Sequence, residues 1–241
     1  METSTSSKSV SAPFWDSVCI VAGGPSAQDV PISFLRCQER LLLVNDAALR
    51  LSSLNPMSSF VSLDNNWVRR HRDFLTSFQG EKFVALPQET WPDCGGIPAV
   101  TYLGWDYDNG LSEDPTKINT GGNSGYGALG VAYLKRAKNI FLVGYDMDPA
   151  VDAKYFEWVP RFRAAAKQLR AAGVSVRNLN PDSHIDAFPR VRISDFKPSD
   201  GWGGYKPSVR DLRRVLATPK HQEMASYRIG KTASAGKGAI S

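Results

Sequence analysis

The chain has 241 residues, of which 42% are hydrophobic, enough for one substantial buried core. No apolar run approaches the roughly 18 residues needed to cross a bilayer, and residues 1–10 lack the apolar core of a signal peptide. Cys19, Cys37 and Cys94 are too few and too far apart to indicate a disulfide framework or a zinc site. These features exclude a membrane protein and predict a soluble protein of the cytoplasm.

The formal charge of +5 is unevenly distributed along the chain. Residues 197–241 contain nine Lys or Arg and three acidic residues, a formal charge of +6, so residues 1–196 are close to neutral. The basic character therefore belongs to the C-terminal segment and does not make the domain before it a nucleic-acid binder. We expect residues 197–241 to form a basic, largely disordered tail, which is a candidate for contact with DNA or with a protein.

Residues 1–15 are rich in serine and threonine and are expected to be disordered. From residue 16 to residue 196, short apolar runs alternate with helical patterns. Strands are predicted at 18–22, 41–44, 59–63, 82–86, 100–103, 140–143 and 174–178. Helices are predicted at 31–37, 67–78, 126–136 and 155–172. Residues 87–118 are otherwise irregular, and such long segments in compact domains are more often functional or mobile than accidental.

This alternation predicts an α/β fold, a Rossmann-like three-layer sandwich with a mainly parallel sheet in a nucleotide-binding domain of residues 16–196. Parallel order places the carboxyl ends of all strands at one edge of the sheet. We call this the carboxyl edge. Ligands bind outside this edge in open α/β sheets.

Small and polar residues gather at the predicted carboxyl edge. They follow the strands that end near residues 22, 44, 63 and 143, and a glycine-rich loop precedes the helix at 126–136. Backbone N–H groups at the start of a helix favour a bound anion, so we predict a phosphate-bearing ligand, a nucleotide. The predicted nucleotide-binding residues are Gly23, Gly24, Pro25, Ser26, Asn45, Asp46, Asn65, Thr120, Gly121, Gly122, Asn123, Ser124, Gly125 and Asp146.

Each of these residues also has a structural interpretation. Gly23 to Ser26 match neither the G-x-G-x-x-G pattern nor a P-loop and could form a simple turn. Asn45 and Asp64 could cap helices, as Asn and Asp commonly do after a strand. Asp146 is somewhat better explained as a capping or loop residue than as a metal ligand. A divalent metal near Asp146 therefore stays open, no metal site is predicted, and the cofactor is unknown.

His184 and Asp64 are the candidate catalytic residues. His184 follows the last predicted strand and could reach the carboxyl edge, where histidine is the usual base for activating a hydroxyl at neutral pH. A histidine hydrogen-bonded in a loop is the plainer interpretation of the same residue. His71 lies among arginines on a helix face that the pattern places in solvent, and His221 lies in the basic tail.

The chain resembles a Rossmann-like group of nucleotide-dependent transferases. The resemblance covers about residues 17–196 and rests on the strand ending in Gly-Gly-Pro-Ser, the strand end at Asn45, Thr120-Gly-Gly-Asn-Ser-Gly before a helix, and Ile-Phe-Leu-Val-Gly-Tyr-Asp. The group includes single-domain bacterial sialyltransferases, motility-associated flagellin glycosyltransferases and archaeal pterin pyrophosphokinases. The chain is most similar to small uncharacterised phage proteins of this group, which would place it in the cytoplasm of a host cell.

The resemblance implies a nucleotide held across the strand ends, with the two glycine loops nearest its phosphate and ribose and with Asn45 and Asn65 in polar contact with it. In the sialyltransferases a histidine beyond the Gly-x-Asp strand acts as the base. The phage relatives often carry a His-rich insert after Gly-Tyr-Asp, which this chain lacks.

Three functions are therefore open. The leading hypothesis is a nucleotide-dependent transferase, a phage-type glycosyltransferase that uses a nucleotide-activated sugar. The second is a non-catalytic protein that binds or sequesters a nucleotide. The third is a virion or assembly protein whose basic tail contacts DNA or a partner.

Overall fold

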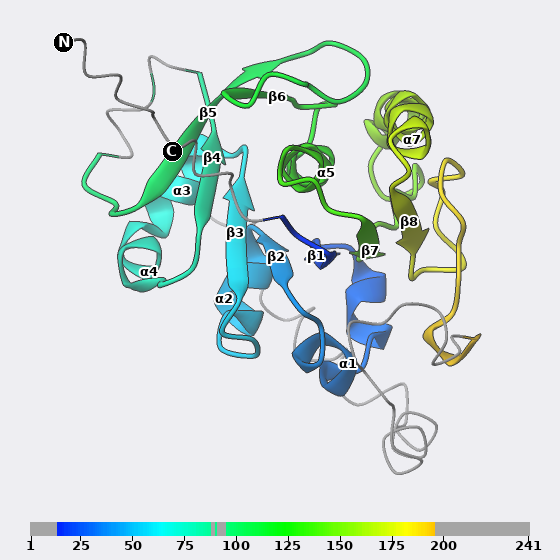
Figure 1. Ribbon diagram of the computed structural model, residues 1–241, viewed down its shortest axis with the longest axis horizontal. Coiled ribbons are helices and arrows are strands. Elements are labelled where there is room, and N and C mark those ends of the chain that lie inside the picture. The colour runs from blue at the N-terminus through cyan, green and yellow to red at the C-terminus, as the bar shows by residue number, and fades with distance from the viewer. Residues whose placement is uncertain (1–13, 88–89, 91–94, 196–241) are drawn as a thin grey trace, which may run out of the picture. The chain divides into compact units, whose positions relative to one another are not determined.

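The computed structural model describes residues 14–87, 90 and 95–195. In this part of the chain, eight strands form one sheet in the order β6-β5-β4-β3-β2-β1-β7-β8, and every neighbouring pair is parallel (Figure 1). The strands are β1 Ser17–Val21, β2 Leu41–Val44, β3 Ser58–Ser62, β4 Lys82–Ala85, β5 Val100–Asp106, β6 Lys117–Asn119, β7 Asn139–Val143 and β8 Ser175–Asn178. The predicted Rossmann-like α/β layout is confirmed.

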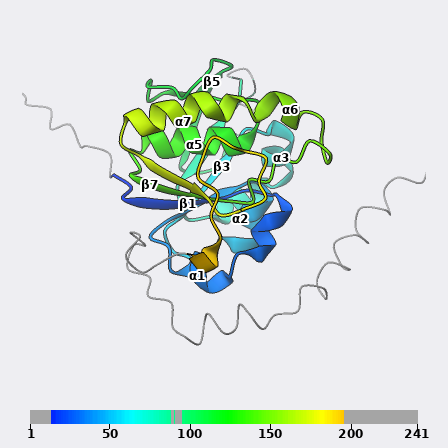
Figure 2. The ribbon, with the colours of Figure 1, turned by 90° about the vertical axis from the view of Figure 1, so that its right-hand side faces the viewer.

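Helices cover both faces of this sheet, which gives the three layers. One apolar core lies between the sheet and α5 and α7, and the other lies between the sheet and α1 to α4 (Figures 1 and 2). The helices are α1 Ile32–Arg36, α2 Asp46–Leu51, α3 Asn65–Arg70, α4 Arg72–Ser77, α5 Ser124–Leu134, α6 Tyr155–Trp158 and α7 Arg161–Ala171, with short 3-10 turns η1 Pro25–Asp29 and η3 Ile193–Asp195.

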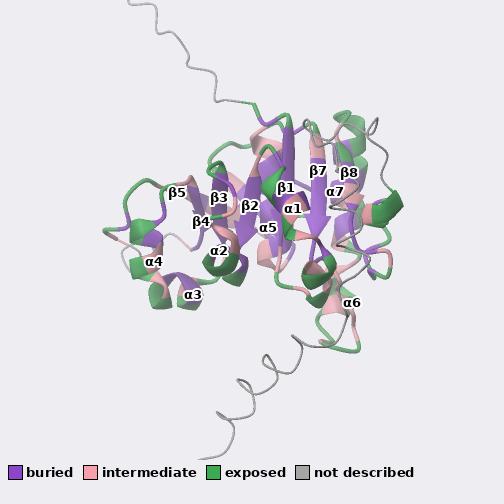
Figure 3. Ribbon diagram, turned by 90° about the horizontal axis from the view of Figure 1, so that it is seen from below, coloured by how far each residue is buried: buried purple, intermediate pink, exposed green. Residues whose placement is uncertain are grey.

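The central strands β1, β2 and β3 are buried along their whole length because both of their faces are covered. In β1, Val18 and Ile20 belong to the core under α5, whereas Cys19 and Val21 belong to the core on the opposite face. Figure 3 shows the central strands β1, β2 and β7 buried and the outer sides of the helices exposed. Burial raises the pKa of the Cys19 thiol far above its ordinary value, so this cysteine is a core residue rather than a nucleophile.

The chain order reverses at β1, since β2 lies on one side of it and β7 on the other. In doubly wound folds a crevice opens at such a reversal, outside the carboxyl ends of the two strands that flank it. The loops after β1 and β7 therefore meet here, and the loops after β2 and β3 follow along the same edge.

Several predicted boundaries are corrected by the structure. The single helix expected at 67–78 is two helices that break at His71, and the one expected at 155–172 is α6 and α7, separated at Pro160. The strand expected at 100–103 extends to Asp106 as β5, and β6 lies at the end of the segment expected to be otherwise irregular. The elements that were not expected are η1, α2, β6 and η3.

The N-terminal boundary is also corrected. Trp15 was placed in the disordered segment, but it is 1% exposed, and its backbone N–H donates to the Lys135 carbonyl over 3.2 Å. The ordered fold therefore includes Trp15. The rest of the expected disordered segment, residues 1–13, and the expected basic tail, residues 197–241, lie outside the described residues. None of the described helices is both long and apolar enough to cross a membrane.

Candidate functional site

A pocket of about 520 Å³ opens at the carboxyl ends of β1, β2 and β3. We call it the carboxyl-edge pocket. It brings together four of the residues predicted from the sequence, one or two from each strand end, and three residues from the α3 region that were not predicted. The lining residues are Gly23, Val44, Asn45, Asp46, Asp64, Trp67, Arg70 and His71.

Asn45 carries two unfavourable features at the end of β2. Its backbone has φ 50° and ψ −121°, a conformation that L side chains rarely adopt. Its side-chain Nδ2 donates to Ser124 Oγ over 3.5 Å, but its Oδ1 is buried and receives no hydrogen bond from the described residues. A buried acceptor without a donor costs about 1–3 kcal/mol, and backbone strain of this kind concentrates at ligand sites.

Ser124 connects the start of α5 to the carboxyl edge. Its Oγ accepts from the Leu63 backbone N–H over 3.2 Å and from Asn45 Nδ2. The glycine loop predicted at 120–125 therefore does reach the strand ends of β2 and β3, with Ser124 as the contacting residue.

Asp46 and Asp64 are both tied to Trp67. The Trp67 indole N–H donates to Asp46 Oδ1 over 2.6 Å, and the Trp67 backbone N–H donates to Asp64 Oδ1 over 2.9 Å. Asp64 is thus the N-cap of α3, the structural role that the sequence left open. Neither Oδ2 receives a hydrogen bond from another described residue, so each carboxylate keeps an acceptor for a ligand.

Trp67, Arg70 and His71 were missed by the sequence analysis. The Trp67 and His71 rings stack with centroids 4.2 Å apart and an interplanar angle of 28°, and His71 Nδ1 lies 2.9 Å from the Trp67 carbonyl oxygen. A signal for them was present. Residues three, six and seven positions after Asp64 share one face of a helix that begins there, so they follow it at the carboxyl edge.

A second group of polar residues lies at the ends of β1 and β7. The Asp146 carboxylate accepts from the Ser26 N–H over 3.2 Å, from the Ser26 hydroxyl over 2.9 Å and from Asn180 Nδ2 over 2.9 Å. Burial raises the pKa of Asp146, and the hydrogen bonds from Ser26 oppose that rise. The Ser26 backbone N–H, which the sequence offered to a ligand phosphate, therefore already donates to the Asp146 carboxylate.

Gly24 also joins the loop after β1 to the loop after β7, so these contacts close the crevice between the two strands. Its N–H donates to the Gly144 carbonyl over 3.1 Å, and a Cβ built on Gly24 would lie 2.0 Å from Asp146 Oδ2. Only glycine fits here, because the loop after β7 lies too close to the Gly24 backbone for a side chain. Gly24, Ser26 and Asp146 thus hold one another, whereas Gly23 alone of this loop lines the carboxyl-edge pocket. Pro25 begins η1, and Asn65 is the first residue of α3.

His184 belongs to this second group. Its backbone N–H donates to the Asp146 carbonyl over 2.9 Å, and its Nε2 lies 3.7 Å from Asp148 Oδ1. Both side chains are partly exposed, at 49% and 42%. The two candidate catalytic residues therefore lie in different groups, because Asp64 lines the carboxyl-edge pocket and His184 does not.

The second glycine loop is tightly packed. Gly121, at φ 53°, lies against the Tyr126 ring, and Gly122, at φ 89°, lies against the Trp158 indole. Asn123 caps α5, since its Oδ1 accepts from the Tyr126 N–H over 2.8 Å, and its buried Nδ2 has no partner among the described residues. The Thr120 N–H donates to the Asp106 carbonyl, and the Gly125 carbonyl accepts from the Tyr145 hydroxyl.

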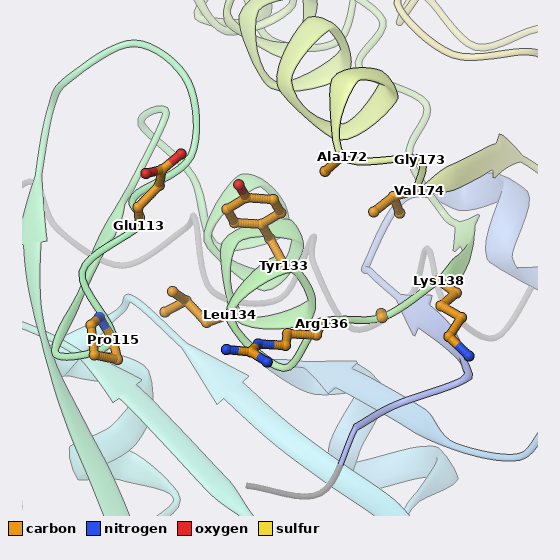
Figure 4. Close-up of a pocket in the computed structure, with 10 residues that line it drawn as sticks. Glu113, Pro115, Tyr133, Leu134, Arg136, Lys138, Ala172, Gly173 and Val174 are labelled. Atoms are coloured by element: carbon orange, nitrogen blue, oxygen red, sulfur yellow. The ribbon is translucent and has the colours of Figure 1, made fainter. Parts of the chain in front are cut away.

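A different pocket, of about 570 Å³, lies at the opposite edge of the sheet, where β7 and β8 begin (Figure 4). We call it the amino-edge pocket. Its cationic side chains have partners elsewhere, because Lys138 Nζ lies 2.7 Å from Asp16 Oδ1 and the Arg136 guanidinium lies over the Phe14 ring. Its remaining walls are Glu113, Pro115, Tyr133, Leu134, Ala137, Ala172, Gly173 and Val174. Polar groups converge less here than in the carboxyl-edge pocket.

Metal binding was left open near Asp146. Within the residues that the structure describes, no group of three or more His, Cys, Asp or Glu side chains gathers in a way that could hold a metal ion. The polar side chains around Asp146 are instead hydrogen-bonded to one another.

The fold and this pocket together define a Rossmann-like α/β protein with a polar pocket at the carboxyl ends of its central strands. Comparison with known proteins adds no narrower class, since no protein-family model matches the chain and no curated protein sequence matches it.

Proposed function

We propose that the protein is a nucleotide-dependent transferase that uses a nucleotide-activated sugar and binds the nucleotide in the carboxyl-edge pocket. The observation that supports this most is the convergence of Gly23, Asn45, Asp46 and Asp64 at three adjacent strand ends around one pocket. This is where parallel α/β sheets bind ligands, and a volume of about 520 Å³ falls within the usual range for small-molecule sites.

The lining chemistry suits the parts of a nucleotide. The unpaired Asn45 Oδ1 and the remaining oxygens of Asp46 and Asp64 are acceptors for ribose hydroxyls or for an amino group of a base. Arg70 is the cation of this pocket and suits the phosphate. At Gly23 no atom lies within 4 Å of a Cβ built there, so the ligand can approach the backbone closely.

Glycosyl transfer is the reaction that the sequence resemblance adds to this binding site. It proceeds by displacement at the donor carbon, with a base that takes the proton of the acceptor hydroxyl. The amide of Ser26 is held by Asp146, so in this proposal Arg70 stabilises the leaving phosphate in place of the first glycine loop.

Calorimetry with CMP, UMP, GMP and AMP and with their nucleotide sugars tests the proposal. We expect one of these ligands to bind the full chain and Arg70→Gln to weaken that binding about tenfold, the effect of losing one charge-assisted contact. Arg136→Gln is the matched control, because it removes the same charge at the amino-edge pocket and should leave the affinity unchanged. Absence of binding at millimolar concentration would contradict the proposal.

A non-catalytic nucleotide-binding protein is the second candidate. It is favoured by the position of His184 outside the pocket lining and by the use of Asp64 as a helix cap. Binding without release of nucleotide from any nucleotide sugar, with or without added hydroxyl acceptors, would support it over the transferase. The third function considered from the sequence depends on the basic tail, which lies outside the described residues.

A further inference from the structure

We propose that His71 is the catalytic base of the carboxyl-edge pocket, an inference that rests on the proposed transferase function. The sequence pattern places His71 on a solvated face of one long helix. In the structure it instead lies at the break between α3 and α4, with backbone φ −113° and ψ 28°, and lines the pocket beside Asp46, Asp64 and Arg70.

The hydrogen bond of His71 fixes which ring nitrogen can act as a base. Nδ1 lies 2.9 Å from the Trp67 carbonyl oxygen, and a carbonyl oxygen can only accept. The neutral imidazole must therefore carry its hydrogen on Nδ1, which leaves the lone pair on Nε2. Nε2 makes no hydrogen bond to the other described residues, so it is available to a hydroxyl that enters the pocket.

The ring is held in place by groups from two strand ends. One face of the imidazole stacks on Trp67, whose indole N–H is bound by Asp46 after β2 and whose backbone N–H is bound by Asp64 after β3. Trp67 is 4% exposed and also stacks on Phe60, which holds it in this position. Asp46, Asp64 and Trp67 are thus positioning residues for His71, an arrangement that orients a base before the substrate arrives.

In the proposed step the acceptor hydroxyl oxygen attacks the donor carbon and forms the new C–O bond. The hydroxyl proton passes to His71 Nε2. The bond from the donor carbon to the phosphate oxygen breaks, and its electron pair leaves with the nucleotide phosphate. The imidazolium that forms shares the pocket lining with the Asp46 and Asp64 carboxylates and with the Arg70 guanidinium.

His184 lacks the hydrogen bond and the place in the pocket lining that His71 has. Its ring nitrogen lies 3.7 Å from Asp148, beyond a normal hydrogen bond, and its side chain is 49% exposed. It also lies outside the lining of the carboxyl-edge pocket. A base at His184 would act on a substrate bound near the end of β7. Spectra and turnover rates of the His71 and His184 variants therefore distinguish the two assignments.

Long-range ¹H–¹⁵N NMR of the histidine rings tests the inference in the full chain, which has three histidines. His71→Gln and His184→Gln spectra provide the assignments. We expect His71 in the Nδ1–H form, and we expect its Nε2 signal to shift when the mononucleotide that binds most tightly in calorimetry is added with its sugar donor. A His71 ring with hydrogen on Nε2, or one unaffected by a ligand that does bind, would overturn the assignment.

Nucleotide release from the bound sugar donor provides the second readout. We expect His71→Gln to lower the turnover rate by about 10²–10⁴-fold, as for loss of a general base, while nucleotide affinity changes less than about threefold. Glu113→Gln at the amino-edge pocket is the control and should leave turnover unchanged. If His184→Gln abolishes turnover and His71→Gln does not, the inference is wrong and the transferase stands. If no nucleotide binds, both proposals fail.

Discussion

At the scale of one residue, Asn45 is less favourable for the stability of the fold than another amino acid would be at the same position. Glycine is the residue that fits a backbone at φ 50° without steric cost, and the buried Asn45 Oδ1 lacks a donor among the described residues. A residue that carries two such energetic costs is typical of a position where stability is exchanged for function.

We therefore expect Asn45→Gly to stabilise the free protein by about 1–2 kcal/mol, because it removes the strain and the unpaired acceptor together. The same variant should bind nucleotide more weakly. Urea denaturation gives the free energy of unfolding, and calorimetry gives the affinity. A variant that is less stable than the natural chain would show that Asn45 supports the fold rather than the ligand.

Asp146 supports a prediction about pH. Burial raises its folded pKa above the ordinary value of 3.8, so the folded protein binds this proton more tightly than the unfolded chain does. Its contribution to stability is then greatest when it is protonated and falls as pH rises from 3.8 through the raised folded pKa.

Asp146→Asn removes this titration and can keep the geometry. An asparagine Oδ1 can accept from the Ser26 N–H and from Asn180, and its Nδ2 can donate to the Ser26 hydroxyl. We expect the stability of the variant relative to the natural chain to increase as pH rises above about 4, measured by urea denaturation at several pH values. A difference that stays constant, or that decreases with pH, would contradict this account.

At the scale of elements, the apolar runs were sufficient to predict most strands. The runs around Ile20, Leu42 and Ile140 are continuous because these strands are buried on both faces. β6 was missed because a strand of three residues in a polar segment has no periodicity to detect. The break at His71 was missed because Trp67 to Phe78 keeps a helical apolar pattern across it.

The same limit applies to the site. Gly23, Asn45, Asp46 and Asp64 could be found because strand ends fix their position, whatever their side chains do. The hydrogen bond from the Ser26 hydroxyl to Asp146 could not be predicted from the sequence, because it joins side chains 120 positions apart. Sequence position thus predicts which residues reach an edge, and packing decides which of them remain available to a ligand.

The loop before α5 provides a test at this scale. A Cβ on Gly122 would lie 2.5 Å from the Trp158 indole nitrogen, and the backbone there has φ 89°. We expect Gly122→Ala to destabilise the protein by about 1–3 kcal/mol through clash and strain. Gly23→Ala is the matched control, since nothing lies within 4 Å of its Cβ, and it should change the unfolding free energy by less than about 0.5 kcal/mol. Equal effects of the two substitutions would contradict the packing described for this loop.

At the scale of the whole domain, the carboxyl-edge pocket is displaced from the point where the strand order reverses. The crevice between β1 and β7 is closed by hydrogen bonds among Ser26, Asp146 and Asn180, and the pocket opens instead across β1, β2 and β3. The carboxyl-edge pocket and the amino-edge pocket lie at opposite ends of the strands of one sheet, so the protection of backbone amides from exchange can tell them apart.

We expect a bound nucleotide to slow amide hydrogen exchange in peptides that cover residues 44–47 and 62–72, because these segments line the carboxyl-edge pocket and a ligand that binds only the folded state stabilises its contacts. Peptides that cover residues 113–115, 133–138 and 172–174 line the amino-edge pocket and should exchange at the same rate with and without ligand. Mass spectrometry of the exchanged peptides measures both. Protection of the second set without the first would place the nucleotide at the amino edge. Protection confined to residues 144–148 and 180–184 would place it at β7, where His184 rather than His71 would be the base.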